Sequence, residues 1–172
     1  MKNLDQEEVT QLLQIIQKKP AQRIVHFCEN TSILNESLAT LCKEYDNDYY
    51  IYCTDPTYFS EATKTFSEQT QIHTMNFNLR RPRYLMQAIE YDYLISTLDF
   101  TDKSKTDFLE KCYPIIRTGG NVLLFISKLG YAERDEWRSI LEEQYYVSVT
   151  IIDNIFKHYD VITAKRMHGW GD

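Results

Sequence analysis

The chain has 172 residues, of which 43% are hydrophobic, and it carries a formal net charge of −6 at pH 7. This length is enough for one domain with a full hydrophobic core and too short for two domains of ordinary size. Binding to a nucleic-acid duplex requires clustered Lys and Arg, so the acidic balance argues against nucleic acid as the main partner. The basic cluster of Arg80, Arg81 and Arg83 is either a solvated loop or an anion-binding patch.

The four cysteines, Cys28, Cys42, Cys53 and Cys112, share no C-x-x-C spacing and lie within apolar stretches. This pattern favours buried free thiols in a reducing compartment over a zinc site or a disulfide framework. The first residues, MKNLDQEEVTQLLQ, are acidic and amphipathic, and no apolar run approaches ~20 residues. We therefore expect a cytoplasmic protein that does not enter a membrane.

Helix and strand patterns alternate along the first half of the chain. Apolar residues at helical spacing predict an N-terminal helix within residues 1–20, which Pro20 ends. The elements expected after it are a strand over 23–29, a helix over 31–45, a strand over 49–56, a helix over 57–69 and a weaker strand over 71–77. Residues 82–91 are expected to form a helical turn or two.

The second half continues the alternation and then changes. The expected elements are a strand over 91–100, a helix over 101–117, a turn at 118–120, a strand over 121–128, a helix over 133–144 and two strands over 145–153 and 158–166. Alternating strands and helices imply a mostly parallel sheet covered on both faces. Only the short NIFK connection separates the last two strands, so they must pair antiparallel and the final strand must run against the rest of the sheet.

With its elements in this order, the chain resembles the class I S-adenosylmethionine-dependent methyltransferases from about Arg23 to Lys165. The best-matching segments are YCTDPTYFSEA, YDYLISTLDF and KCYPIIRTGGNVLLF. The resemblance implies one methyltransferase-like domain over residues 1–172, with a C-terminal tail at 166–172. It also implies an α/β fold with a doubly wound, mostly parallel seven-stranded sheet, helices on both faces, and an antiparallel last strand inserted beside the fifth.

The family's cofactor loop, acid-x-Gly-x-Gly-x-Gly, corresponds here to His26, Cys28, Asn30 and Ser32. Glycines in such a loop admit positive φ and let the backbone approach the ligand. Cys, Asn and Ser are small enough to leave the loop open, so the resemblance still implies cofactor contacts there. His26 stands where the family has an acid, and its alternative role is that of a buried core histidine. Glu29 can supply the negative charge in place of that acid, or it can interact with the dipole of the adjacent helix.

Three further positions are implied to contact the cofactor. Asp55 follows the second strand and corresponds to the acid that accepts hydrogen bonds from the ribose hydroxyls, although Asp55-Pro56 also has the pattern of a helix start. Asn78 follows the third strand, near the expected adenine position, and Ser96 ends the fourth strand. Asp99, in the segment that would face the transferred methyl group, is a candidate general base or a plain surface carboxylate before a helix.

The predicted topology indicates at which edge of the sheet the two remaining candidate segments lie. The 153–156 connection is expected at the carboxyl edge, where ligands of open α/β sheets bind, either as a hairpin turn or as part of a pocket. The MHGWGD tail is expected at the opposite edge, far from any cofactor.

The sequence supports two alternative functions. One is a methyltransferase that uses S-adenosylmethionine on a small-molecule substrate. The other is a non-catalytic binding or assembly module of the same fold with a protein partner, which the missing glycines and the abundant tyrosines favour. A nicotinamide-binding domain is disfavoured because its glycine fingerprint is absent.

Overall fold

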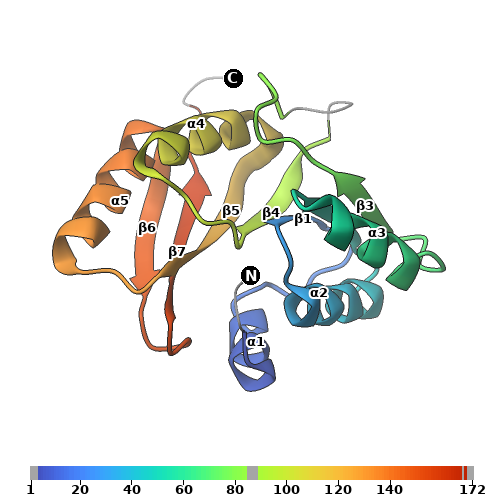
Figure 1. The fold of residues 1–172 in the computed structure, drawn as a ribbon. Coiled ribbons are helices and arrows are strands. Elements are labelled where there is room, and N and C mark those ends of the chain that lie inside the picture. Colours follow the sequence, from blue (N-terminus) through green and yellow to red (C-terminus); the bar gives the residue numbers. More distant parts are fainter. Residues whose placement is uncertain (1–3, 85–88, 168, 170–172) are drawn as a thin grey trace.

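The computed structural model describes residues 4–84, 89–167 and 169, and its centre is a twisted seven-stranded sheet in the order β3-β2-β1-β4-β5-β7-β6 (Figure 1). The strands are β1 (Arg23–Cys28), β2 (Asp48–Cys53), β3 (Ile72–Asn76), β4 (Tyr91–Ser96), β5 (Ile116–Ser127), β6 (Tyr146–Ile152) and β7 (Tyr159–Arg166). The first five strands pair in parallel. The expected fold class is therefore confirmed.

Strand β7 is antiparallel to both of its neighbours, β5 and β6. It lies between them, as the resemblance implied, and Ser127 at the end of β5 pairs with Tyr159 at the start of β7. The physical reason is the one read from the sequence: the chain between β6 and β7 is too short to cross the sheet and start a parallel strand.

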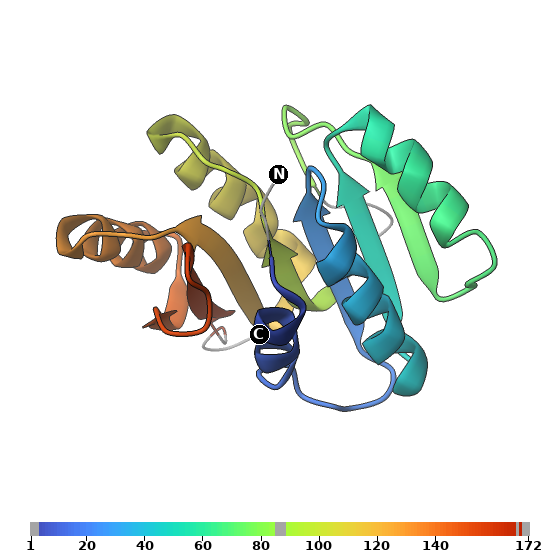
Figure 2. The same cartoon turned by 60° about the horizontal axis from the view of Figure 1, so that its bottom comes forward.

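Helices cover both faces of the sheet (Figures 1 and 2). They are α1 (Gln6–Leu13), α2 (Ser32–Glu44), α3 (Pro56–Thr65), α4 (Asp102–Cys112) and α5 (Tyr131–Glu143), with a short 3₁₀ turn, η1 (Tyr113–Ile115). One core cluster joins the sheet to α1, α2 and α3, and a second joins the opposite face to α4 and α5. Strand β1 is central to both clusters, because Ile24 and Cys28 face the first and Val25 and Phe27 face the second.

The N-terminal helix is shorter than the sequence indicated. It ends at Leu13 rather than near Pro20, and the chain turns there so that Ile16 is buried in the core. The Gln17 N–H then donates to the Tyr93 hydroxyl at 3.0 Å. This contact with a strand distant in sequence takes the place of further helical hydrogen bonds, and apolar periodicity alone could not reveal it.

The Gly-Gly segment is also different from the expectation. Residues 118–120 do not form a turn before the fifth strand, because β5 already begins at Ile116. Between the pairs Tyr91↔Ile116 and Tyr93↔Asn121, strand β4 advances by two residues and β5 by five, so the glycines lie in a bulge. Gly119 has a φ of 74° there, a conformation that glycine adopts without steric cost.

Gly120→Ala is expected to lower the free energy of unfolding by about 1–3 kcal/mol, as overpacking does in other cores. An added Cβ would lie 2.7 Å from the Arg117 carbonyl oxygen, 2.8 Å from Ile116 Cγ2 and 3.1 Å from the Tyr91 carbonyl oxygen. Urea denaturation measures the effect. Gly130→Ala is the control, because its Cβ would meet only the movable Glu133 carboxylate at 3.3 Å; equal losses in the two variants would contradict the prediction.

Two expectations concern segments that the structure describes only in part. The helical turns expected within 82–91 overlap residues 85–88, which lie outside the described residues, as do His168 and Trp170 of the tail. Strand β7 ends at Arg166, whose Nη1 donates to the Ile116 carbonyl at the amino end of β5. Among the described residues, no helix has both the length and the apolar character needed to cross a bilayer.

Candidate functional site

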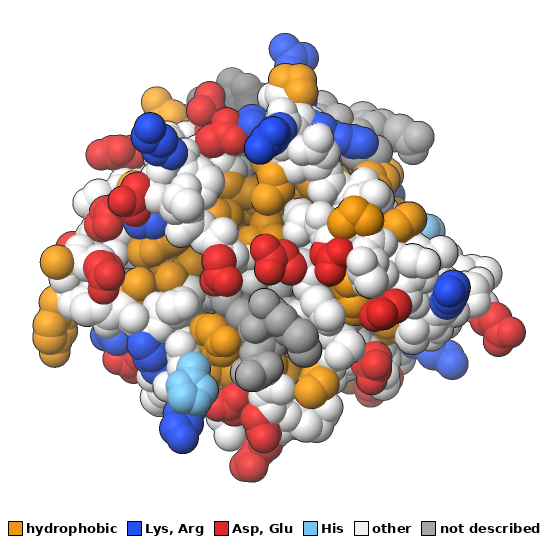
Figure 3. Space-filling model, in the orientation of Figure 1, with side chains coloured by type: hydrophobic (Ala, Val, Ile, Leu, Met, Phe, Trp, Pro, Cys, Tyr) orange, Lys and Arg blue, Asp and Glu red, His pale blue; other side chains and the backbone are white. Residues whose placement is uncertain are grey.

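The carboxyl ends of β1, β2 and β4 lie next to one another, and the loops that follow these strands meet there. The Thr54 N–H donates to the Cys28 carbonyl at 2.9 Å, and the Thr97 N–H donates to the Phe27 carbonyl at 3.0 Å. Asp55 therefore lies beside the turn between β1 and α2, as a cofactor site of the expected kind requires. The face in Figure 3 includes this edge, and acidic side chains cross its middle next to recessed hydrophobic surface.

The turn from Glu29 to Thr31 joins β1 to α2 without a glycine. Among the described residues, positive φ in a non-glycine residue occurs at Ala21, Asp46, Tyr145 and Ser148, and hence not in this turn. The turn thus needs no left-handed residue. Glu29 is exposed and Asn30 is half-buried.

Not all of the predicted cofactor residues reach the surface of this turn. Cys28 is fully buried beneath it, whereas Ser32 is exposed in the first turn of α2. Thr31 is the N-cap of α2, but its side chain makes no capping hydrogen bond. The accessible groups here are therefore those of Glu29, Asn30 and Ser32.

Asp55 is the N-cap of α3. Its Oδ1 accepts a hydrogen bond from the Thr57 N–H at 2.8 Å, and Pro56 occupies the first position of the helix. The helix-start pattern is thus confirmed. Capping uses only Oδ1 and leaves Oδ2, within the described part of the chain, without a hydrogen-bond partner. One side chain can therefore cap the helix and still accept a hydrogen bond from a ligand.

The other two predicted cofactor positions differ in exposure. Asn78 is exposed after β3, and its Oδ1 accepts from the Arg80 N–H at 2.9 Å. Ser96 is fully buried at the end of β4, and its Oγ accepts from the Leu98 N–H at 3.3 Å. Asn78 can reach a ligand at this edge, whereas Ser96 shapes the loop after β4.

His26 is fully buried at the centre of a hydrogen-bond network, referred to below as the His26 network. Its Nδ1 lies 2.6 Å from Asn35 Oδ1, and its Nε2 lies 2.9 Å from Thr97 Oγ1. Since the Asn35 oxygen can only accept, Nδ1 carries the proton and Nε2 accepts from the Thr97 hydroxyl. Tyr49 donates to the same Asn35 oxygen at 2.6 Å, and Asn35 Nδ2 donates to the Tyr58 hydroxyl at 2.6 Å.

The His26 network ties together the elements that frame the carboxyl edge. It links β1, α2, β2, α3 and the residue after β4, and burial raises the pKa of Tyr49 and Tyr58, which keeps both phenols neutral. The geometry favours the core-histidine alternative, because both ring nitrogens are engaged inside the protein. Sequence reasoning did not single out the partners of His26. The available signal was Asn35, a polar residue on the inward face of an amphipathic helix.

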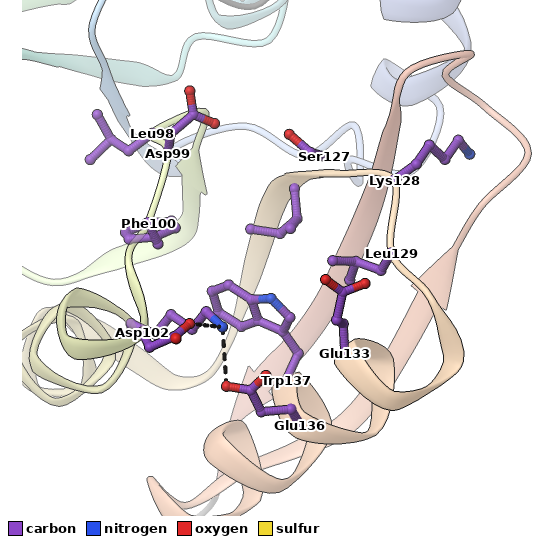
Figure 4. Close-up of a pocket in the computed structure, with 12 residues that line it drawn as sticks. Leu98, Asp99, Phe100, Asp102, Ser127, Lys128, Leu129, Glu133, Glu136 and Trp137 are labelled. Carbon is purple, nitrogen blue, oxygen red and sulfur yellow. Dashed lines mark hydrogen bonds and ion pairs between the residues drawn. The ribbon is translucent and has the colours of Figure 1, made fainter.

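A pocket of about 510 Å³ opens at the carboxyl ends of β4 and β5, between α4 and α5 (Figure 4). Its lining residues are Leu98, Asp99, Phe100, Asp102, Lys105, Ile126, Ser127, Lys128, Leu129, Glu133, Glu136 and Trp137. The carboxylate of Asp99 lies at one end, and the Trp137 ring lies at the other with Asp102 and Glu136. Asp99 is exposed and so has access to a bound molecule.

Lys105 forms much of the wall at the Trp137 end. Its ammonium group lies 3.0 Å from Asp102 and 3.1 Å from Glu136, and 5.2 Å from the centre of the buried Trp137 ring. These partners neutralise its charge and hold it in place. Phe100 packs edge-on against Trp137 at 5.9 Å. The pocket thus combines a fixed ion-paired wall with an aromatic floor.

A buried ion-pair cluster fixes the loop between β5 and α5 beside this pocket. Asp160 of β7 is fully buried, with Lys128 Nζ at 2.9 Å and Arg134 Nη2 at 3.1 Å, and it accepts from the Leu129 N–H. Arg134 also contacts Asp153, and this guanidinium lowers the pKa of the Asp153 carboxyl. The 153–156 connection therefore lies at the carboxyl edge, as expected, where it braces the pocket wall.

Solved structures of known proteins share this architecture. An S-adenosylmethionine-dependent O-methyltransferase from Thermotoga maritima matches with a TM-score of 0.75 and 11% identity, over 100% of this chain and 69% of that one. A phosphoethanolamine N-methyltransferase from Haemonchus contortus, solved with S-adenosylhomocysteine, matches with a TM-score of 0.72 and 8% identity, over 94% and 52%. This chain has the class I methyltransferase fold.

A further structural neighbour has a name that does not mention methyl transfer. A fibrillarin pre-rRNA processing protein from Methanococcus jannaschii matches with a TM-score of 0.71 and 15% identity, over 90% of this chain and 70% of that one. No family model and no curated protein matches the sequence. The chain also spans only about half the length of the Haemonchus enzyme. At these sequence identities the structural similarity shows the fold, and any inference about activity or substrate must come from the residues of the site.

Proposed function

We propose that the protein is an S-adenosylmethionine-dependent methyltransferase that acts on a small molecule. The observation that carries the proposal is the position of Asp55. It lies at the carboxyl end of β2, beside the β1–α2 turn, with one carboxylate oxygen used for capping and the other available to a ribose hydroxyl. Glu29, Asn30, Ser32 and Asn78 surround the same edge and are the further residues that would hold the cofactor.

The pocket supports a small-molecule methyl acceptor. Its volume of about 510 Å³ is in the usual range for small-molecule sites, and it opens next to the loop that follows β4. The Trp137 floor and the neighbouring apolar residues would bury an apolar part of the acceptor, and the ion-paired Lys105 would limit how deeply it enters.

The chemistry requires little of the protein beyond alignment and exclusion of water. Bound S-adenosylmethionine would supply a methyl group activated by a sulfonium. Asp99 would accept the proton that an amine or hydroxyl acceptor releases, and Phe100 and Leu98 would keep bulk water from that proton transfer. Methyl transfer from a sulfonium depends mostly on orientation, so one carboxylate is a sufficient catalytic set.

Thermal denaturation with and without S-adenosylmethionine tests the proposal. At a hundred times its dissociation constant, a ligand stabilises the native state by ~2.7 kcal/mol, and the melting temperature of a domain of this size should rise by roughly 5–10 °C. Asp55→Ser should abolish the shift, since serine can cap α3 through its single oxygen but lacks the second carboxylate oxygen that would accept from the ribose.

Asp5→Ser is the matched control. Asp5 caps α1 in the same way, with Oδ1 accepting from the Glu7 N–H at 2.7 Å, and it belongs to the N-terminal helix rather than to a strand end. The control variant should keep the full ligand-induced shift. No shift in the unmodified protein at millimolar cofactor would instead support the non-catalytic binding or assembly module. The side chains at the family's glycine positions, Cys28, Asn30 and Ser32, favour that alternative.

A further inference from the structure

Cys28 and Cys53 occupy equivalent positions in neighbouring strands. Each is the last residue of its strand, and the two are direct register partners across β1 and β2. Both are fully buried, and both belong to the core cluster on the α2 and α3 face. Their side chains therefore point to the same side of the sheet, from neighbouring positions at the ends of the two strands.

This placement suits a covalent bond between the sulfurs. Neighbouring strands lie about 4.7–4.9 Å apart, and disulfides join Cα atoms that are about 4.4–6.8 Å apart. Because both residues end their strands, the turns after them can absorb the adjustment that bond formation requires. Cys112 cannot form a disulfide with either residue, since it is buried in the core cluster on the opposite face of the sheet.

The surroundings of the two thiols make them unequal. The neighbouring Cys53 thiol and the Asn35 amide lower the pKa of Cys28, and Asn35 Nδ2 lies 3.6 Å from its sulfur. The neighbouring Cys28 thiol and burial raise the pKa of Cys53. The Asn35 amide, which donates to the Cys28 sulfur, favours the thiolate of Cys28, and Cys53 is the neighbour that can displace a leaving group from it.

We propose that Cys28 and Cys53 form a redox-active dithiol that a small-molecule disulfide oxidises to an intramolecular disulfide. The Cys28 thiolate attacks one sulfur of the oxidant, whose sulfur–sulfur bond breaks and releases one thiol. Cys53 then attacks the mixed disulfide and releases the second thiol. The protein loses two electrons and two protons, and the oxidant gains both as two thiols.

The β1–α2 turn controls both the access of an oxidant to the two thiols and the structural effect of the disulfide. Cys28 immediately precedes the exposed Glu29, and the N-cap of α2, Thr31, makes no side-chain capping hydrogen bond, so local opening of this turn would expose the dithiol. The disulfide would draw the ends of β1 and β2 together beneath Glu29 and Asp55. If the proposed function holds, oxidation would disturb the cofactor edge; the oxidation itself does not depend on that function.

The test is incubation of the full native chain with oxidised glutathione, followed by denaturation, alkylation and mass analysis. The number of alkylated thiols should fall from the four that the sequence provides to two, without retained glutathione. After trypsin cleavage at Arg23, Lys43 and Lys64, peptide 24–43 should be linked to peptide 44–64. Four alkylated thiols, or stable mixed disulfides without this link, would overturn the proposal.

Single variants identify the bonded pair. Peptide 24–43 contains both Cys28 and Cys42, but Cys42 lies on α2 and, unlike Cys28, is not a register partner of Cys53. Cys42→Ser is the matched control and should still form the link, whereas Cys28→Ser and Cys53→Ser should not. A link that survives Cys28→Ser would assign the bond to Cys42 and contradict the proposal. On the unmodified chain, fragmentation of the linked peptides shows whether Cys42 carries the alkyl group, as the proposal requires, so the test stands even if a variant fails to fold.

Discussion

Replacing His26 with leucine should lower the free energy of unfolding by roughly 3 kcal/mol. The imidazole is fully buried, donates to Asn35 Oδ1 at 2.6 Å and accepts from the Thr97 hydroxyl at 2.9 Å. Leucine can do neither, so the buried Thr97 hydroxyl loses its acceptor, and the buried Asn35 oxygen loses one of its two donors and keeps Tyr49. Each such group costs about 1–3 kcal/mol. Urea denaturation, with the slope compared between variants, measures the loss.

Changes to the partners of His26 show whether the hydrogen bonds cause this loss. Thr97→Ser keeps the hydroxyl and should be mild, whereas Thr97→Val removes the donor to Nε2 and should cost about 1–3 kcal/mol. Because His26 and Asn35 are in contact, the double variant His26→Leu, Asn35→Leu should lose less than the sum of the two single losses. If the loss in the double variant equals the sum of the two single losses, or if His26→Leu leaves the free energy of unfolding unchanged, the network contributes no stability.

Asp160→Ala should be similarly costly, at about 3 kcal/mol, because it breaks a buried ion pair by removing one side. Asp160 is fully buried, and it balances the charges of Lys128 and Arg134 at 2.9 Å and 3.1 Å. Without it, the two cations repel each other and the Leu129 N–H loses its acceptor. Thermal and urea denaturation measure the loss of stability.

Asp153→Ala is the control for this ion-pair cluster. Asp153 contacts the same guanidinium at 2.9 Å, but its side chain is about half exposed, so water replaces the interaction and the loss should be much smaller than for Asp160→Ala. Equal losses in the two variants would show that burial of Asp160 does not decide its contribution. Since Lys128 lines the pocket, Asp160→Ala should also loosen the pocket wall.

The reversed last strand shows how far local sequence can predict this fold. The NIFK connection permits only an antiparallel pair, and the structure places β7 antiparallel to both neighbours. The Asp55-Pro56 pattern likewise predicted a helix start that the structure contains. Both inferences succeed because they depend on the length of a loop or on the chemistry of adjacent residues.

The errors concern contacts between residues distant in sequence. The first helix ends at Leu13, and the chain after it contacts Tyr93 through Gln17; the Gly-Gly segment lies in a bulge where the register between β4 and β5 shifts. The role of His26 was left open for the same reason. Its partners Asn35, Tyr49 and Thr97 lie on three different elements, and no spacing along the chain brings them together.

The sequence by itself determined the order of helices and strands, the direction of the last strand and the strand-end position of Asp55, because periodicity, capping and loop length act over a few residues. Only the tertiary structure decided which polar side chains are buried, that Cys28 and Cys53 are register partners, and that a pocket opens between α4 and α5. These features arise where strands distant in the chain pair and bring their ends to one edge, and the energy of such contacts depends on the whole packed sheet.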